Sequence, residues 1–195
     1  LGFTQLVGLD LSAELLDVAS CTMAAESEAS EDECEFALVR SDMRQIPFKE
    51  YFGTVLSLFT SFGYFEQEEE NQAVFQAVYR VLRPGGRFLI DYLSRDHVIA
   101  HLVPEDIKIL PGRRVHSVRR LTDDRRRVEK TTTVTTDGGR VRRFHESVRM
   151  YSQPEMAAML EAAGFAHIEC YGSLDRQACN PESERLIVAA EKGGT

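Results

Sequence analysis

Two acidic residues follow short apolar runs in positions where they could bind a nucleotide. Asp10 ends the run of residues 6–9, and Asp42 follows the run of residues 36–39 after two polar positions. A carboxylate at the end of the second strand of a nucleotide-binding α/β domain accepts hydrogen bonds from ribose hydroxyls. The pattern predicts this role for Asp10, with capping of the next helix as the alternative. The alternative for Asp42 is a loop acid that bonds its own backbone.

A second group of side chains could transfer a proton or hold a substrate. Candidate bases are Tyr64, Asp91, Tyr92 and His145, and the sequence does not select among them. In residues 140–152, strict alternation predicts one apolar face and one polar face, with the apolar face packed on the domain. The apolar face holds Phe144, Val148 and Met150, and the polar face holds Arg143, His145, Ser147, Arg149 and Tyr151.

The polar face leaves alternatives open for its charged residues. His145 is either a substrate contact or base, or a surface residue with a structural role. Arg143 and Arg149 either clamp an anionic substrate or form ion pairs with nearby acids. We expect Tyr92, Arg143 and Arg149 to be the substrate-binding candidates.

The elements that position these residues alternate along the first half of the chain. Apolar periodicity predicts strands that end at Asp10 and span residues 36–39, 54–59 and 87–91, with helices from Ser12 to about residue 25 and over residues 68–82. The strand at 54–59 is apolar enough to be buried on both faces. Strands alternating with helices predict a mainly parallel sheet.

The second half of the chain interrupts this alternation. Residues 113–121, 128–136 and 140–152 are predicted to form a three-stranded antiparallel β-meander, inserted at about residues 108–152. Ser152 to Glu155 form a capping box that begins a helix. Residues 166–171 and 185–190 are predicted to pair as antiparallel strands at one sheet edge. We expect one domain over residues 1–195.

Five segments in this order resemble the class I S-adenosylmethionine-dependent methyltransferases, in particular the small-molecule branch with a β-insertion. The segments are residues 7–12, 41–43, 58–64, 82–91 and 163–165. The resemblance implies a Rossmann-like fold and S-adenosyl-L-methionine as the cofactor. It implies that Asp10 and Leu11 lie at the ribose, Asp42 and Met43 at the adenine, and Phe59 and Thr60 at the methionine half. Tyr64 and His145 are the catalytic candidates.

One motif of this family is missing from the sequence. No Gly-x-Gly-x-x-Gly motif occurs in it, and the chain starts at Leu1. We expect the first strand and its glycine loop to be absent, and because that strand is the central one, we expect a divided sheet. One alternative to a methyltransferase of small molecules is therefore an impaired protein of this fold that acts through a partner or a swapped dimer. A dehydrogenase is a weaker alternative, since an acid after the second strand also suits NAD.

Charge and composition limit the partners. The net charge is −8, with six acids in residues 26–35 and eight basic residues in residues 113–130. The overall acidity argues against nucleic acid, although the basic segment makes an RNA methyltransferase a further alternative. Cys21, Cys34, Cys170 and Cys179 have no zinc-type spacing, so free thiols and no metal are expected. With no membrane span or leader in the sequence, we expect a cytoplasmic protein, with a homodimer as one option.

Overall fold

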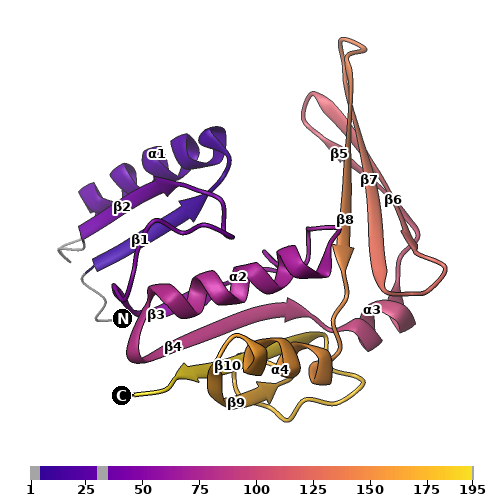
Figure 1. The fold of residues 1–195 in the computed structure, drawn as a ribbon. Helices are drawn as coiled ribbons and strands as arrows, with labels where there is room; N and C mark the ends of the chain where they lie inside the picture. Colours follow the sequence, from indigo (N-terminus) through magenta and orange to yellow (C-terminus); the bar gives the residue numbers. More distant parts are fainter. Residues whose placement is uncertain (1–4, 30–34, 195) are drawn as a thin grey trace.

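The computed structural model describes residues 5–29 and 35–194 and arranges their strands in three sheets (Figure 1). The start of the chain at Leu1, Cys34 and half of the acidic segment lie outside the described residues. The first sheet pairs β1 (Gln5–Asp10) in parallel with β2 (Glu35–Arg40), with α1 (Ala13–Ala29) between them in sequence. The predicted strand, helix and strand are thus confirmed, with α1 about a turn longer than expected.

The second sheet has the order β3-β4-β10-β9 and carries the main core. β3 (Phe52–Ser57) is parallel to β4 (Leu82–Leu93), while β10 (Arg185–Lys192) is antiparallel to both β4 and β9 (Phe165–Tyr171). The antiparallel pairing of β9 and β10 is confirmed. β1 and β2 are not hydrogen-bonded to this sheet, which is the divided arrangement that the sequence predicts for a chain without the central strand.

Two amphipathic helices supply most of the core over this sheet. α2 (Glu68–Val81) buries Val74, Phe75 and Val78, and α4 (Gln153–Ala162) buries Met156 and Leu160. These side chains pack with aromatic and aliphatic residues of β4, β9 and β10. The prediction that residues 54–59 form a strand buried on both faces is wrong, because β3 is an edge strand and Leu56 is 55% exposed.

The third sheet is the insertion, and it has four strands rather than the expected three. β5 (Glu105–Leu110), β6 (Arg113–Leu121), β7 (Arg127–Thr136) and β8 (Val141–Arg149) form an antiparallel sheet in chain order. The sequence analysis missed β5 and the short helix α3 (Arg95–His101) before it. Figure 1 shows this sheet standing out from the core, with α3 at its base and β8 leading back to α4.

The prediction of one packed face and one outward face for residues 140–152 is only partly correct. Phe144, expected to pack on the domain, is 51% exposed, whereas Arg149 and Tyr151, expected to point away, are 3% and 2% exposed. The reason is the shape of the sheet, since its far end lies in solvent on both faces while its base is enclosed by α2 and α4. Among the described residues, no helix combines the length and apolar character needed to cross a bilayer.

The predicted capping box at the start of α4 is confirmed. The Ser152 hydroxyl accepts a hydrogen bond from the Glu155 backbone N–H, and the Glu155 side chain accepts one from the Ser152 N–H at 2.8 Å. We expect Ser152→Ala to lower the free energy of unfolding by about 1 kcal/mol, because one N–H at the helix start loses its acceptor. Urea denaturation measures this, and Ser20→Ala on the exposed side of α1 is the control. Equal stabilities of the two variants would contradict the prediction.

Candidate active site at the carboxyl ends of the strands

Asp10 lies at the end of β1, beside the end of β2. Its Oδ1 accepts a hydrogen bond from the Ser12 N–H at 2.8 Å, and the Ser12 hydroxyl in turn accepts from the Leu15 N–H at 3.2 Å. The Ser41 N–H donates to the Asp10 carbonyl at 3.1 Å, which joins the two strand ends. Ser12 therefore caps α1, and Asp10 supports the turn with one oxygen. Within the described part of the chain, Oδ2 of Asp10 has no hydrogen-bond donor, so a ligand can use it.

Asp42 and Met43 follow β2, and Asp42 is held by a neighbouring arginine. The Arg44 N–H donates to Oδ1 of Asp42 at 2.8 Å, and its guanidinium forms an ion pair with the carboxylate. These hydrogen bonds lower the pKa of Asp42, so the carboxylate is ionised near neutral pH. Arg44 also pairs with Glu70 of α2 and lies over the Phe65 ring at 4.3 Å. The hydrogen bond from the Arg44 N–H matches the alternative that the sequence left open for Asp42, a loop acid that bonds the nearby backbone.

Phe59 and Thr60 follow β3 in a strained turn. Both have left-handed backbone conformations, with φ of 55° and 61°, which non-glycine residues adopt at a cost of about 1–3 kcal/mol each. Asp91 of β4 holds the turn, because its carboxylate accepts from the Phe59 N–H at 3.1 Å and its carbonyl accepts from the Thr60 N–H at 3.0 Å. Asp91 is thus engaged in positioning this turn. The Phe59 side chain is left 86% exposed.

Arg185 completes the support of this turn, and the sequence analysis missed it. Its Nε donates to Oδ1 of Asp91 at 2.7 Å, and its Nη2 donates to the Thr60 hydroxyl at 3.2 Å. Only the pairing of β10 with β4 brings residue 185 to this place, so no local pattern could have indicated the contact. An observed strain held by buried polar contacts at the end of a strand is typical of a functional turn.

Tyr64 lies on the segment that joins β3 to α2, and β7 and β8 hold this segment. The Gly63 carbonyl accepts from the Arg149 N–H at 2.8 Å, and the Phe65 carbonyl accepts from Arg127 at 3.1 Å. Tyr64 is 46% exposed. Burial raises the pKa of its hydroxyl and the Glu146 carboxylate raises it further. Tyr64 is therefore protonated at neutral pH, so its hydroxyl can donate a hydrogen bond.

A cavity of about 530 Å³ lies between α3 and the insertion sheet, on the face that carries Glu146. Its apolar lining comes from Val98, Leu102, Val103, Val128 and Val148, and its polar lining includes the ion pairs Lys130–Glu146 and Arg119–Asp106. A cavity of this size, mostly apolar with a few fixed polar groups, is typical of a small-molecule site.

His145 and Arg143 lie on the other face of β8 from Glu146, because neighbouring residues of a strand alternate. His145 is exposed, and its Nδ1 lies 3.3 Å from the Thr131 hydroxyl. Arg143 is exposed and pairs in register with Thr133. The structure therefore does not bring these two residues into the cavity that Glu146 and Val148 line.

Tyr92 and Arg149 are buried and bonded to each other. The Tyr92 hydroxyl donates to the Arg149 carbonyl, and burial raises the pKa of this hydroxyl. The Arg149 guanidinium binds Glu68 of α2 at 2.8 Å and Glu155 of α4 at 2.7 Å. The sequence left two alternatives for Arg149, a clamp on an anionic substrate or ion pairs with nearby acids. The structure shows the ion pairs. Both side chains join the insertion to the core, and neither faces a cavity with its polar group free.

The Arg149 cluster makes stability depend on pH. Burial raises the pKa of Glu155, but hydrogen bonds from Ser152 and Arg149 outweigh it and hold the pKa at about 2. A folded-state pKa below the unfolded value of 4.5 stabilises the fold above pH 4.5, and this contribution is lost as the pH falls toward 2. We expect the stability difference between the wild type and Glu155→Gln to shrink between these pH values in thermal melts. The control Glu161→Gln should show no such change.

The basic segment of the insertion is largely used within the protein. Arg119, Arg120, Arg126 and Lys130 form ion pairs with Asp106, Glu129, Glu155 and Glu146, and Arg127 binds backbone carbonyls. These pairs leave fewer cations for phosphate groups than the sequence suggests.

Comparison with known proteins agrees with this arrangement. A solved S-adenosylmethionine-dependent methyltransferase from Clostridium acetobutylicum superposes with a TM-score of 0.81 at 16% identity, covering 96% of this chain and 75% of that one. The sugar N-methyltransferase KedS8 from Streptoalloteichus gives a TM-score of 0.68 at 21% identity, covering 96% and 70%. The fold is thus that of the class I S-adenosylmethionine-dependent methyltransferases.

The sequence comparison defines the family further. Residues 1–86 match the model of the methyltransferase domain family. A dTDP-3-amino-3,4,6-trideoxy-alpha-D-glucopyranose N,N-dimethyltransferase from Streptomyces venezuelae is 29% identical over 169 residues, which are 83% of this chain. The chain spans 66% of the length of that relative.

Proposed function

We propose that the protein transfers a methyl group from S-adenosyl-L-methionine to a small-molecule acceptor. The observation that carries the proposal is the strained turn at Phe59 and Thr60, which Asp91 and Arg185 hold at the carboxyl end of β3. Ligands of open α/β sheets bind at the carboxyl ends of the strands, where Asp10 and Asp42 also lie. The match of residues 1–86 to the methyltransferase domain family supports the same chemistry.

The residues at these strand ends fit the cofactor. We propose that Oδ2 of Asp10 accepts from the ribose hydroxyls, with Leu11 beside it, and that Met43 contacts the adenine. Asp42 would accept from the adenine amino group beside Arg44. The exposed Phe59 ring and Thr60 would lie along the methionine half. The bound cofactor supplies an electrophilic methyl group on a sulfonium, and the protein has to hold the acceptor in line with it.

We propose that the acceptor occupies the cavity between α3 and the insertion sheet, with Glu146 at its polar side and the Tyr64 hydroxyl within electrostatic reach of Glu146. An amine is the favoured acceptor, since the Glu146 carboxylate can attract an ammonium group and accept the proton that its nitrogen must lose before it attacks the methyl group. The Streptomyces venezuelae relative is named as an N,N-dimethyltransferase of an amino sugar. We leave Tyr92, Arg149, His145 and Arg143 out of this site because of their burial or their place on the other sheet face. A cytoplasmic location and a homodimer stay predictions of the sequence.

Calorimetric titration of the protein with S-adenosylhomocysteine tests the cofactor part of the proposal. We expect saturable binding in the micromolar range, with NAD giving no heat. Binding of NAD in place of S-adenosylhomocysteine would favour the dehydrogenase. An RNA acceptor would instead show as RNA binding whose affinity falls steeply with salt, because phosphate contacts release counterions.

Tyr64 gives a specific test of the acceptor site. We expect Tyr64→Phe to lower kcat/KM for methyl transfer to an amine acceptor by about 2- to 10-fold, the value of one neutral hydrogen bond. The affinity for S-adenosylhomocysteine should not change. Tyr171→Phe is the matched control, since the Tyr171 hydroxyl binds Glu169 at a distant edge of the sheet. Loss of cofactor affinity in Tyr64→Phe, with unchanged kcat/KM, would contradict the placement.

A further inference from the structure

Two cysteines face each other across a short antiparallel bridge at the end of β9. Tyr171 pairs with Ala178, and the Gly172 N–H donates to the Gln177 carbonyl at 2.8 Å. In this register Cys170 and Cys179 are the next pair of opposite residues. Opposite residues of antiparallel strands have Cα atoms about 4.5–5.5 Å apart and side chains on the same side. Disulfides need Cα separations of about 4.4–6.8 Å, so the register suits one.

The surroundings of the two thiols keep them close and accessible. Both cysteines are free and only half-buried. Burial raises the pKa of Cys170, and the charge of the Cys179 thiolate raises it further, which places the two sulfur atoms within electrostatic reach. The side chain of Gln153, at the start of α4, forms a hydrogen bond with the Cys170 thiol.

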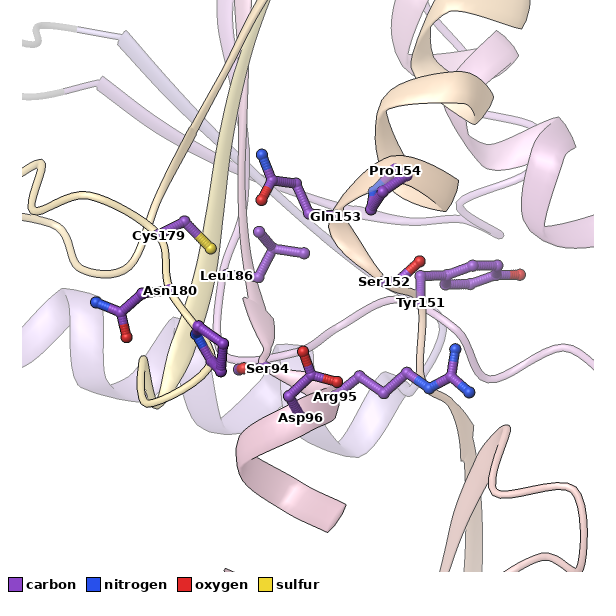
Figure 2. Close-up of a pocket in the computed structure, with 11 residues that line it drawn as sticks. Ser94, Arg95, Asp96, Tyr151, Ser152, Gln153, Pro154, Cys179, Asn180 and Leu186 are labelled. Carbon is purple, nitrogen blue, oxygen red and sulfur yellow. The ribbon is translucent and has the colours of Figure 1, made fainter. Parts of the chain in front are cut away.

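Cys179 also belongs to the wall of a second cavity, of about 240 Å³, beside the start of α3. Figure 2 shows Cys179 and Gln153 on the same side of this cavity as Leu186, with Asn180 next to Cys179. Residues 172–184, which join β9 to β10, supply Cys179, Asn180 and Pro181 to the lining, which also includes Ser94 and Asp96. The same segment leads directly into Arg185, which binds Asp91 and the Thr60 hydroxyl.

We propose that Cys170 and Cys179 are a redox modification site that forms a reversible disulfide with a small-molecule disulfide as the oxidant. The thiolate of one cysteine attacks the oxidant and releases one thiol. The thiolate of the other cysteine then attacks the mixed disulfide and releases a second thiol. With glutathione disulfide, two protein thiols are oxidised to one disulfide and two glutathione molecules are formed. The disulfide bond fixes residues 172–184 to β9. It thereby also restrains the segment that leads into Arg185.

The experiment uses the variant Cys21→Ser/Cys34→Ser, so that only this pair of thiols remains. The folded protein is incubated with excess glutathione disulfide at pH 8, where more of each thiol ionises than at pH 7. It is then alkylated and digested with trypsin. Cleavage after Arg149, Arg176 and Arg185 separates the two cysteines. We expect mass spectrometry to find peptides 150–176 and 177–185 joined, and dithiothreitol to separate them.

The control and the consequence are measured on the same background. The further change Cys170→Ser should give only a glutathione adduct on Cys179. In the parent variant, oxidation should raise Tm by about 5–10 °C, because closing a ring of ten residues restricts the unfolded chain. Glutathione adducts on both cysteines without joined peptides would overturn the proposal. A disulfide without a rise in Tm would overturn the fixing of residues 172–184.

Discussion

Replacing Arg149 with methionine is expected to lower the free energy of unfolding by about 3 kcal/mol, because the change removes a buried guanidinium that binds two partly exposed carboxylates and a backbone carbonyl. The Arg149 side chain is 4% exposed and binds Glu68 and Glu155 at 2.8 and 2.7 Å. Its guanidinium also donates to the Met150 carbonyl and lies over the Tyr151 ring at 4.6 Å. Because α2, α4 and β8 all meet at this side chain, no neighbouring group can take its place.

Urea denaturation and thermal melts measure the effect, and a fall in Tm of roughly 10 °C corresponds to the expected loss. Arg143→Met is the matched control, since it removes the same charge from the same strand at an exposed position. We expect the control to change the free energy of unfolding by no more than about 0.5 kcal/mol. Similar losses in the two variants would show that the net charge of the insertion, rather than the buried cluster, stabilises the fold.

The contrast between these two arginines shows how far the sequence determines the site. Both lie on the same face of one strand by alternation, and the sequence left clamping a substrate and forming ion pairs open for both. Their burial differs because Glu68 is 81 residues from Arg149 along the chain, and only packing of α2 against β8 brings the two together. Local patterns, such as the capping box at Ser152 and Glu155, are predicted well because all their partners lie within one helical turn.

The same distinction explains the errors in the insertion. β5 is exposed at five of its six positions, all except Asp106, so its pairing with β6 leaves little trace in its own sequence. The sequence predicts Phe59 as the last residue of a strand, so it indicates neither the turn at Phe59 and Thr60 nor the support of that turn by Arg185. Arg185 follows Thr60 by 125 residues, and the topology of β3, β4 and β10 makes them neighbours.

The cofactor site gives the second large effect, at Asp10. We expect Asp10→Asn to weaken binding of S-adenosylhomocysteine by about 10- to 100-fold, since hydrogen bonds to a charged acceptor are worth about 1.5–3 kcal/mol. Asparagine keeps an oxygen for the Ser12 N–H, so the turn before α1 is preserved and Tm should stay close to that of the wild type. Calorimetry measures the affinity, and Tm checks the fold.

Asp17→Asn is the control, because Asp17 is an exposed acid on α1 with the same charge. If both variants bind S-adenosylhomocysteine as the wild type does, Asp10 has no role at the cofactor. Its carboxylate then only supports the turn before α1, through its hydrogen bond with Ser12. If Asp10→Asn alone loses affinity while its Tm is unchanged, the loss comes from Oδ2, the oxygen that the Ser12 N–H does not use. The two oxygens of one carboxylate then have separate roles, one in the fold and one at the ribose.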